Sequence, residues 1–506
     1  MKETIEIAKE VLKNNRRSGY TLPTNNELYP AQWNWDSAFI ALGYSYFNMD
    51  YAIKELETLL TGQWDDGMIP HILFHDNDES YFPNHKTWEC GNKIPSSGIT
   101  QPPIIATIVK KIVDQNKLDQ GQMKRMETII KKLIIYLDWF YNYRDTNKIG
   151  LVSIIHPWES GLDNSPIWDS PLDKVKIEEN LKYERRDLNV SKSENRPLKK
   201  DYDAYITLLN QFKKDRYNPK KIVNESMFNI IDIGFNSILI RATKDLVEVA
   251  TKFNLDFSDL FNKTSMSEES LIKFYKEEEQ SFFSYDFKNH NLVKIDAISN
   301  YFVLFANLEN KDINNKIISK LKKYNSQREY FFTTVNPKDK TFEETRYWRG
   351  PVWINSNWII YQGLINKDKN FSELLKNKTL ELLENKKFLV LFSEDKKHNE
   401  YFSILQREIK EPIIQSYLNE KFAFINSLKG HYVNSGPSGA PTRGKTEVLP
   451  TGKNFYSIDS RGLPTESAWI VGSQSATQII DLYKQDHGED LKKIAISVWA
   501  TSTMRN

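Results

Sequence analysis

Long stretches of this chain repeat apolar residues every three or four positions, whereas alternation of apolar and polar residues is scarce. This spacing is that of the buried face of an amphipathic helix. The clearest stretches span residues 104–115, 126–143, 228–250, 313–324 and 371–384. We therefore expect a mainly α fold in which helices pack through their apolar faces.

The composition favours a globular protein with no broad attraction to a charged polymer or surface. The chain has 506 residues, of which 40% are hydrophobic, so it can bury one large core or two ordinary ones. Its 69 Lys and Arg residues nearly balance its 67 Asp and Glu residues. The net charge of +2 predicts neither nucleic acid nor an anionic membrane as a partner.

The first residues and the cysteine content bear on location and cofactors. The start of the chain, residues 1–17, reads as a charged amphipathic helix unlike a signal peptide, and no run of 18 apolar residues follows. We expect a cytoplasmic protein. The single cysteine, Cys90, excludes an intramolecular disulfide and a thiolate metal cluster. No ligand cluster suggests a catalytic metal, and we expect no cofactor.

Between the expected helices lie loops that combine tryptophan with carboxylates, amides, glycine and proline. Examples are YPAQWNWDSAF at 29–39, QWDDGMIPHI at 63–72 and HPWESGLDNSPIWD at 156–169. Tryptophan rings stack on the C–H faces of a pyranose, and Asp, Asn, Gln and Arg bind its hydroxyl groups. A single tryptophan is more often a core residue, but the clustering with polar partners favours a sugar site.

Further motifs follow in a specific order: SGITQPP at 97–103, RPLKKDYDAY at 196–205 and YWRGPVWINSNW at 347–358. With the loops above, they give residues 1–402 a resemblance to the mannosylglycerate and glucosylglycerate hydrolases of glycoside hydrolase family 63. The resemblance implies an (α/α)6 barrel with a pocket formed by loops at one end. It also implies hydrolysis of a small α-glycoside with inversion.

The resemblance assigns the two carboxyl groups that inversion requires. One protonated acid donates to the leaving oxygen, and a carboxylate roughly 6.5–9.5 Å away activates a water on the opposite face. Asp163 matches the general acid, and an apolar wall would raise its pKa. Glu159 is the alternative acid, although we favour a carboxylate bonded to the loop backbone. Glu400, in NEYFS at 399–403, matches the base, with an exposed surface glutamate as the alternative.

The resemblance also implies a set of substrate-binding residues. Asp36 is expected to accept hydrogen bonds from vicinal hydroxyl groups, and Arg196 suits the carboxylate of a glycerate aglycone. For Arg196 the alternative is an ordinary loop salt bridge, and Arg349 could be a buried structural cation. The full expected set is Trp35, Asp36, Gln101, Arg196, Tyr202, Tyr347, Trp348 and Trp353.

The last hundred residues have a different character. GPSGAPTRG, VLPTGKNFYSIDSRGLP and ISVWATSTMR resemble part of the cobaltochelatase large subunit, over about residues 405–506. GAPTRGKT, at 439–446, fits the Walker A pattern, but Pro450 and Gly452 would interrupt the helix that a P-loop needs. We therefore expect no ATP site there.

Three hypotheses follow from these two resemblances. The first is an inverting α-glycosidase domain at 1–402, its barrel incomplete at the C-terminal end, followed by a short α/β-type fragment at 403–506. The second is a tetrapyrrole-binding protein that uses the C-terminal fragment. The third is a catalytically impaired fusion of the two. The sequence leaves the choice of glucose or mannose, the aglycone and the oligomeric state open.

Overall fold

The computed structural model describes residues 2–24, 29–76, 80–190, 195–324, 331–386, 391–392, 415–436, 448–455, 464 and 466–496. The chain separates into two compact units, Met1–Ser393 and Glu394–Asn506. The proposed base Glu400 and the Walker-like segment at 439–446 both lie outside the described residues.

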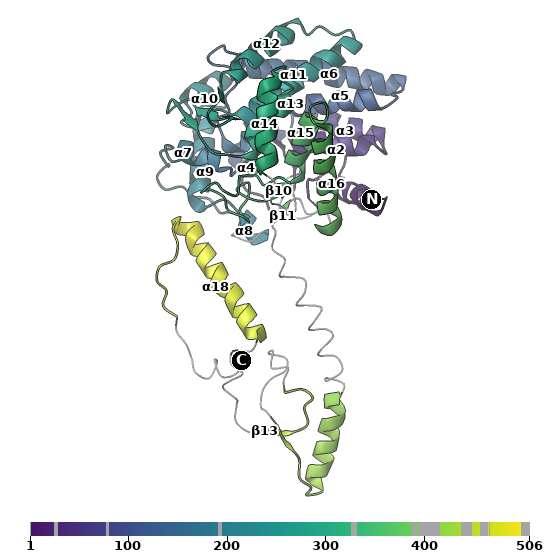
Figure 1. Ribbon diagram of the computed structural model, residues 1–506, viewed down its shortest axis with the longest axis vertical. Coiled ribbons are helices and arrows are strands. Elements are labelled where there is room, and N and C mark those ends of the chain that lie inside the picture. The colour runs from purple at the N-terminus through teal and green to yellow at the C-terminus, as the bar shows by residue number, and fades with distance from the viewer. Residues whose placement is uncertain are drawn as a thin grey trace. The chain divides into compact units, whose positions relative to one another are not determined.

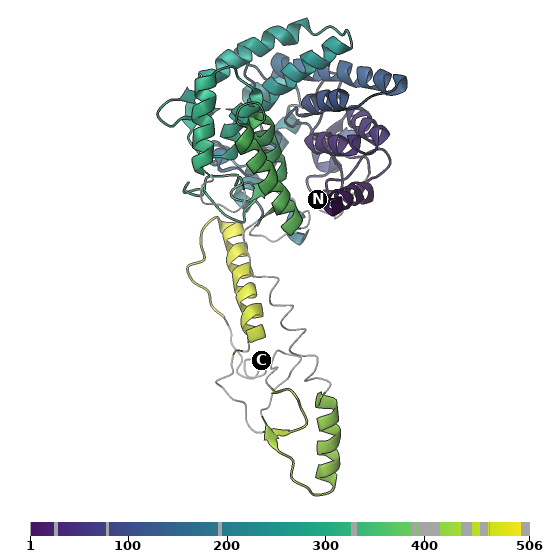
Figure 2. The same ribbon diagram turned by 45° about the vertical axis from the view of Figure 1, so that its right-hand side comes forward.

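The first unit is an α/α barrel of paired helices (Figure 1 and Figure 2). Its inner series runs through α2 (Asn34–Ser45), α5 (Ile105–Gln115), α11 (Ile233–Lys252), α13 (Val303–Ala306) and α15 (Ile354–Leu364), each packed on the next. The two ends of this series meet where the rings of Phe39 and Trp358 lie 5.4 Å apart. The mainly α fold expected from the periodicity is therefore confirmed.

Outer helices pack against most of the inner ones. These are α3 (Met49–Leu60) on α2, α6 (Gln120–Tyr143) on α5, α12 (Ser258–Ile272) on α11 and α16 (Lys369–Lys386) on α15. Further helices are α1 (Lys2–Asn15), α4 (His85–Trp88), α7 (Asp169–Leu172), α8 (Asp187–Val190), α9 (Lys199–Lys214), α10 (Pro219–Glu225) and α14 (Lys311–Tyr324). The 3-10 helices are η1 (Pro157–Ser160), η2 (Pro166–Trp168) and η4 (Ile298–Phe302).

Short strands join the helices. A four-stranded antiparallel sheet has the order β1 (Gln32–Trp33), β2 (Ile72–Leu73), β4 (Pro95–Ser96), β3 (Cys90–Gly91). A second sheet has three strands in the order β5 (Ile230–Ile231), β8 (Ser284–Asp286), β9 (Asn291–Val293). Two-stranded pairs are β6 (Tyr275–Lys276) with β7 (Ser281–Phe282), and β10 (Val352–Trp353) with β11 (Leu391–Phe392).

The helix expected over 228–250 begins later than the periodicity indicated. Residues 230–231 form β5 and pair with β8, so their apolar side chains are buried by the sheet. Helix α11 starts after Asp232, whose carboxylate accepts a hydrogen bond from the Phe235 N–H at 2.7 Å. An apolar run cannot by itself separate a buried strand from the first turn of a helix.

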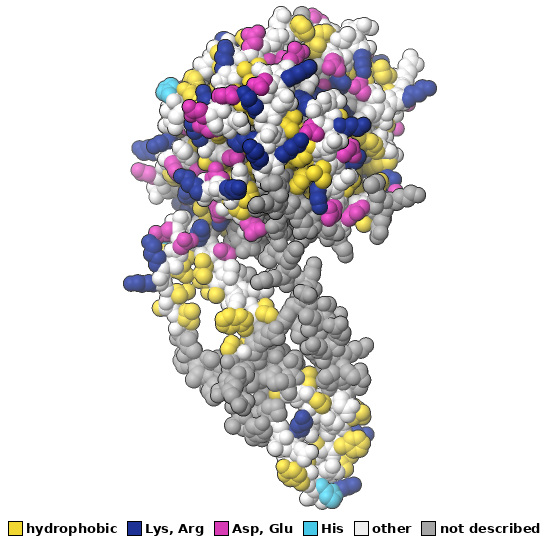
Figure 3. Space-filling model, viewed as in Figure 1, with side chains coloured by type: hydrophobic (Ala, Val, Ile, Leu, Met, Phe, Trp, Pro, Cys, Tyr) yellow, Lys and Arg dark blue, Asp and Glu magenta, His cyan; other side chains and the backbone are white. Residues whose placement is uncertain are grey.

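The first unit has a surface of mixed charge (Figure 3) around a large apolar core. Figure 3 shows basic and acidic side chains interspersed over one face of the first unit. One continuous core cluster runs from Ala31 to Leu375. Among the described residues, no helix is both long and apolar enough to cross a membrane.

The described part of the second unit contains helical and strand segments. A helix covers 415–428, and α18 spans Glu466–His487. Between them β12 (Ser435–Gly436) pairs in parallel with β13 (Asn454–Phe455). This mixture is the one expected of a short α/β-type fragment.

Candidate active site

The turn over residues 156–169 is built by local capping and one glycine. The His156 side chain accepts a hydrogen bond from the Trp158 N–H at 3.1 Å, which starts η1. Gly161 ends η1 with φ +70°, and a Cβ there would lie 2.7 Å from the Trp35 indole. Glycine therefore lets Trp35 pack directly on the turn. The Tyr205 hydroxyl then donates to the Asp163 carbonyl at 2.9 Å.

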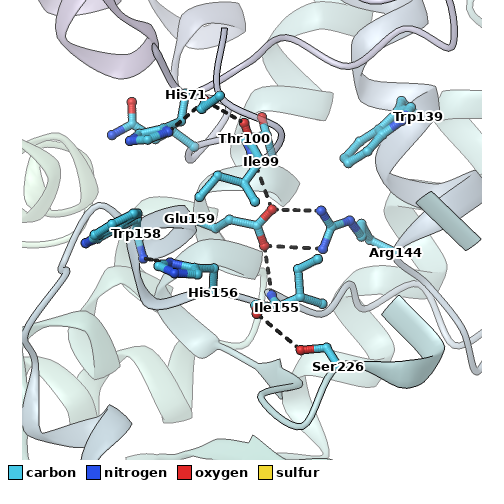
Figure 4. Close-up of polar contacts among 12 residues, drawn as sticks. His71, Ile99, Thr100, Trp139, Arg144, Ile155, His156, Trp158, Glu159 and Ser226 are labelled. Carbon is cyan, nitrogen blue, oxygen red and sulfur yellow. Dashed lines mark hydrogen bonds and ion pairs between the residues drawn. The ribbon is translucent and has the colours of Figure 1, made fainter. Parts of the chain in front are cut away.

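Glu159 anchors this turn inside the protein (Figure 4). Its carboxylate receives two hydrogen bonds from the Arg144 guanidinium, at 2.7 and 3.3 Å, and each side chain is 1% exposed. The N–H groups of Ile155 and Thr100 donate to the same carboxylate at 2.8 and 3.3 Å. The expectation that Glu159 bonds the loop backbone is confirmed. The sequence did not reveal its ionic partner.

The contact with Thr100 links the turn to the start of α2. Gln101 follows Thr100, and its side-chain oxygen accepts a hydrogen bond from the Trp35 N–H at 3.2 Å. The Tyr136 hydroxyl donates to the Gln101 carbonyl at 3.1 Å. Asp36 stands next to Trp35. The segments that carry Asp163 and Asp36 are therefore joined through Glu159, Thr100 and Gln101.

Asp163 and Asp36 are partly exposed carboxyl groups without a salt bridge within 4 Å among the described residues. Burial raises the pKa of Asp163 to about 7, and the nearby charge of Asp36 adds to this. Arg196 and a hydrogen bond from Tyr347 act in the opposite direction. Burial likewise raises the pKa of Asp36 to about 7. Near neutral pH, Asp163 can hold a proton for transfer.

A chain of hydroxyl groups connects Asp163 with Arg196. The Tyr347 hydroxyl donates to Asp163 Oδ2 at 3.4 Å and lies 3.1 Å from the Tyr29 hydroxyl. Arg196 Nη1 donates to Tyr29 at 3.3 Å, and its guanidinium lies 4.6 Å from the centre of the Tyr347 ring. Tyr29, Asp163, Arg196 and Tyr347 come from four motifs that are distant in the sequence, and they meet at one place.

Arg196 shares a carboxylate with a second arginine. Its Nε donates to Asp187 Oδ2 at 2.8 Å, and Arg185 binds both oxygens of Asp187 at 3.0 and 2.7 Å. The Arg185 guanidinium also lies 4.0 Å from the centre of the Tyr202 ring. Two guanidinium groups and one carboxylate leave one positive charge, which suits a monoanionic ligand. The salt bridge considered as an alternative for Arg196 is thus present.

The expected aromatic residues are mostly buried. Trp35 and Tyr202 are 6% and 5% exposed, and Trp348 and Trp353 are 2% and 8% exposed. Trp348 and Trp353 stack on each other, with ring centroids 4.0 Å apart and an interplanar angle of 8°. Each therefore gives one face to the other, and the Tyr347 ring is more exposed than either of them. Contact of these rings with a sugar stays a prediction.

Arg349 is paired with Asp169, as expected of a buried structural cation, and its Nη1 donates to Asp169 Oδ2 at 2.9 Å.

The structure also adds residues that the sequence did not single out. Tyr29 belongs to a motif already singled out, so its position was accessible from the sequence. Asp187 and Arg144 lie outside the quoted motifs, and no sequence signal pointed to them. In the described part of the chain, no group of three or more His, Cys, Asp or Glu could hold a metal ion.

Comparison with known proteins gives a consistent result for the first unit. The family model for the mannosylglycerate hydrolase MGH1-like glycoside hydrolase domain matches residues 29–402. The mannosylglycerate hydrolase of Thermus thermophilus is 38% identical over 387 residues, covering 75% of this chain and 92% of that enzyme. The glucosylglycerate hydrolase of Mycolicibacterium hassiacum is 28% identical, covering 66% of this chain and 79% of that enzyme.

A solved structure agrees with these sequence matches. The structure of a GH63 mannosylglycerate hydrolase from Thermus thermophilus, in complex with Tris and D-glycerate, has a TM-score of 0.75 and 37% sequence identity. The alignment covers 77% of this chain and 94% of that chain. The same enzyme is also known in complex with glucose.

The C-terminal residues are similar to another protein. The aerobic cobaltochelatase subunit CobN of Pseudomonas aeruginosa is 52% identical over 81 residues, which cover 16% of this chain. The match spans only 6% of CobN. The similarity therefore concerns a small part of that subunit.

Proposed function

Because the chain belongs to the mannosylglycerate hydrolase MGH1-like glycoside hydrolase family, we propose that it hydrolyses mannosylglycerate or glucosylglycerate with inversion. Asp163 is the proposed general acid and Glu400 the proposed general base. One observation carries the proposal. The Asp163 carboxyl group is partly exposed, so a substrate can reach it, and its partial burial raises its pKa to about 7. The relatives include a mannosylglycerate hydrolase and a glucosylglycerate hydrolase, which supports these two glycosides as substrates.

In the proposed reaction, protonated Asp163 donates its proton to the glycosidic oxygen as the bond to the sugar breaks. A water on the opposite face attacks the anomeric carbon, and Glu400 takes its proton. An α-glycoside then yields the β-anomer and free glycerate. The match of NEYFS to the family motif supports Glu400, which lies outside the described residues.

The aglycone carboxylate is proposed to bind beside Arg196. The excess positive charge of Arg185, Asp187 and Arg196 supports this, since a guanidinium binds a carboxylate by paired hydrogen bonds. Tyr29 and Tyr202 flank the same arginines. Asp36 is proposed to accept hydrogen bonds from the sugar hydroxyls, with Trp35, Gln101, Tyr347, Trp348 and Trp353 as its surroundings.

A catalytically impaired fusion is the second candidate. The observation in its favour is that similarity to glycoside hydrolases ends at residue 402, and similarity to CobN covers the C-terminal residues. We propose residues 1–402 as the glycosidase domain and 403–506 as the CobN-like segment. Against impairment, the matched region spans 92% of the Thermus enzyme.

Proton NMR of the purified full chain with mannosylglycerate and glucosylglycerate distinguishes these candidates. Initial appearance of the β-anomer, absent with Asp163→Asn, is the expected result. Initial release of the α-anomer would contradict inversion. No turnover of either glycoside by a chain that is folded by circular dichroism would support the impaired fusion.

A further inference from the structure

The first turn of α2 has no side-chain cap, although it carries Trp35 and Asp36. Trp33 occupies the N-cap position and makes no capping hydrogen bond. A helix start without a cap leaves its first N–H groups dependent on other contacts. The backbone N–H groups of Asn34 and Trp35 donate to the His71 carbonyl at 3.0 Å and to Gln101 Oε1 at 3.2 Å. These bonds hold one side of the turn.

The other side of the turn is held by Glu55 of α3, which is fully buried. Its Oε1 accepts hydrogen bonds from Ser37 Oγ at 2.8 Å and from Gln32 Nε2 at 3.1 Å. Gln32 Nε2 also donates to Ser37 Oγ at 3.0 Å. Residues 32 and 37 flank the segment 33–36, so one carboxylate oxygen fixes both ends of the stretch that carries Asp36.

The second oxygen of Glu55 binds a different part of the chain. Thr21 Oγ1 donates to Oε2 at 2.8 Å, and Thr21 lies in the segment that follows α1. The Gln32 side chain also contacts His75, whose Nε2 lies 2.7 Å from Gln32 Oε1. In the described part of the chain, no Lys, Arg or His forms an ion pair with Glu55. The side-chain donors to Glu55 are therefore neutral groups that form directional hydrogen bonds, and the backbone of Thr21 also donates to it.

We propose that Glu55 is a positioning residue that orients the first turn of α2, and with it Trp35 and Asp36, for sugar binding. The proposal rests on the proposed glycoside hydrolase reaction for its functional part. A buried carboxylate has a large cost of transfer from water unless donors surround it. Here two of its three side-chain donors belong to the ends of one short segment. Loss of that contact releases the segment without removing any residue that would touch the sugar.

Two hydroxyl deletions make a matched test, because Ser37 and Thr21 bind opposite oxygens of Glu55 at the same distance of 2.8 Å. Ser37→Ala removes a bond on the Asp36 side, whereas Thr21→Val removes one on the far side. Both hydroxyl groups are buried, so both variants should lower the melting temperature similarly. Glu55→Gln keeps the shape and an acceptor oxygen, and serves as the conservative variant.

The expected result is that Ser37→Ala raises KM about tenfold with kcat within about twofold, whereas Thr21→Val changes both by less than about twofold. Amide hydrogen exchange of residues 33–37 should become about tenfold faster in Ser37→Ala alone. Glu55→Gln should keep the wild-type exchange rate and KM. These readouts separate positioning from a general loss of stability.

Equal effects of Ser37→Ala and Thr21→Val on exchange at 33–37, or on KM, would overturn the proposal. An unchanged exchange rate in Ser37→Ala would do the same. Exchange does not depend on turnover. If the wild-type chain hydrolyses neither glycoside, the proposed function fails, while a selective increase in exchange in Ser37→Ala still supports Glu55 as the residue that orients this turn.

Discussion

The turn over 156–169 carries two carboxyl groups, Glu159 and Asp163, in opposite situations. Glu159 is 1% exposed and bound by a guanidinium and two backbone N–H groups. Asp163 is partly exposed, its hydrogen-bonding partner is the Tyr347 hydroxyl at 3.4 Å, and burial raises its pKa to about 7. Four positions thus separate a carboxylate that anchors structure from one suited to transfer a proton.

The difference arises from the partners and not from the residue type. Burial raises the pKa of Glu159 as well, but the Arg144 guanidinium and the backbone N–H groups of Ile155 and Thr100 act against that rise and favour the charged carboxylate. A carboxyl group that is desolvated without such a partner is stabilised in its neutral form. The following predictions test this contrast, from the largest expected effect to the smallest.

Asp163→Asn should lower kcat for hydrolysis of the preferred glycoside by about 100- to 10,000-fold, because amides cannot donate the proton that a general acid supplies. Steady-state kinetics on the full chain measures this. Asp173→Asn, which removes an exposed carboxylate from the same region, is the matched control and should keep the wild-type rate. Comparable activity of Asp163→Asn and wild type would remove Asp163 from the mechanism.

Glu159→Gln should lower the free energy of unfolding by roughly 3–5 kcal/mol, since it leaves Arg144 buried and without its counterion. Urea denaturation followed by circular dichroism measures the loss. Asp163→Asn should show no loss of this size. The contrast would be reversed if Glu159→Gln kept its stability and lost all turnover, because Glu159 would then be the better candidate for the acid.

The pH dependence of kcat/KM should have an alkaline limb with a midpoint near pH 7. Asp163 must be protonated to act as the acid, and its pKa is raised from 3.8 to about 7. Activity should therefore fall about tenfold per pH unit above the midpoint. Measurement from pH 5 to 9 gives the profile. Tyr347→Phe removes a hydrogen bond that lowers the pKa of Asp163, so it should move the limb to higher pH.

A midpoint near pH 4 would contradict the effect of burial on Asp163. A shift of the limb to lower pH in Tyr347→Phe would contradict the role of that hydroxyl. Tyr183→Phe is a suitable control, because the Tyr183 hydroxyl donates to Asp203 and not to Asp163. The pH profile of this variant should match that of the wild type.

Asp163→Asn should raise the melting temperature at pH 8 by about 1–3 °C. The pKa of Asp163 is higher in the folded chain than its ordinary value of 3.8. The folded state therefore holds the proton more tightly, and stability is lost as pH rises from about 4 through 7. The gain from Asn should shrink at pH 5. Calorimetry at both pH values tests this, and an equal gain at both would exclude the ionisation of Asp163 as its cause.

Much of the fold was predictable from apolar spacing. The stretches 104–115, 126–143, 313–324 and 371–384 correspond to α5, α6, α14 and α16. Helix spacing is a local property, so it survives in a single sequence. The start of α11 was placed too early, because pairing of β5 with β8 lies outside the reach of local periodicity.

The sequence by itself determined the mainly helical class through the spacing of its apolar residues, and its ordered loop motifs carried the resemblance to the family that the comparisons show. Only the tertiary structure decided which carboxyl groups are paired. Arg144 meets Glu159 across 15 positions, and Glu55 meets Thr21 across 34. Desolvation and ion pairing depend on distances between side chains brought together by folding, and these distances decide whether a carboxyl group anchors a turn or holds a proton.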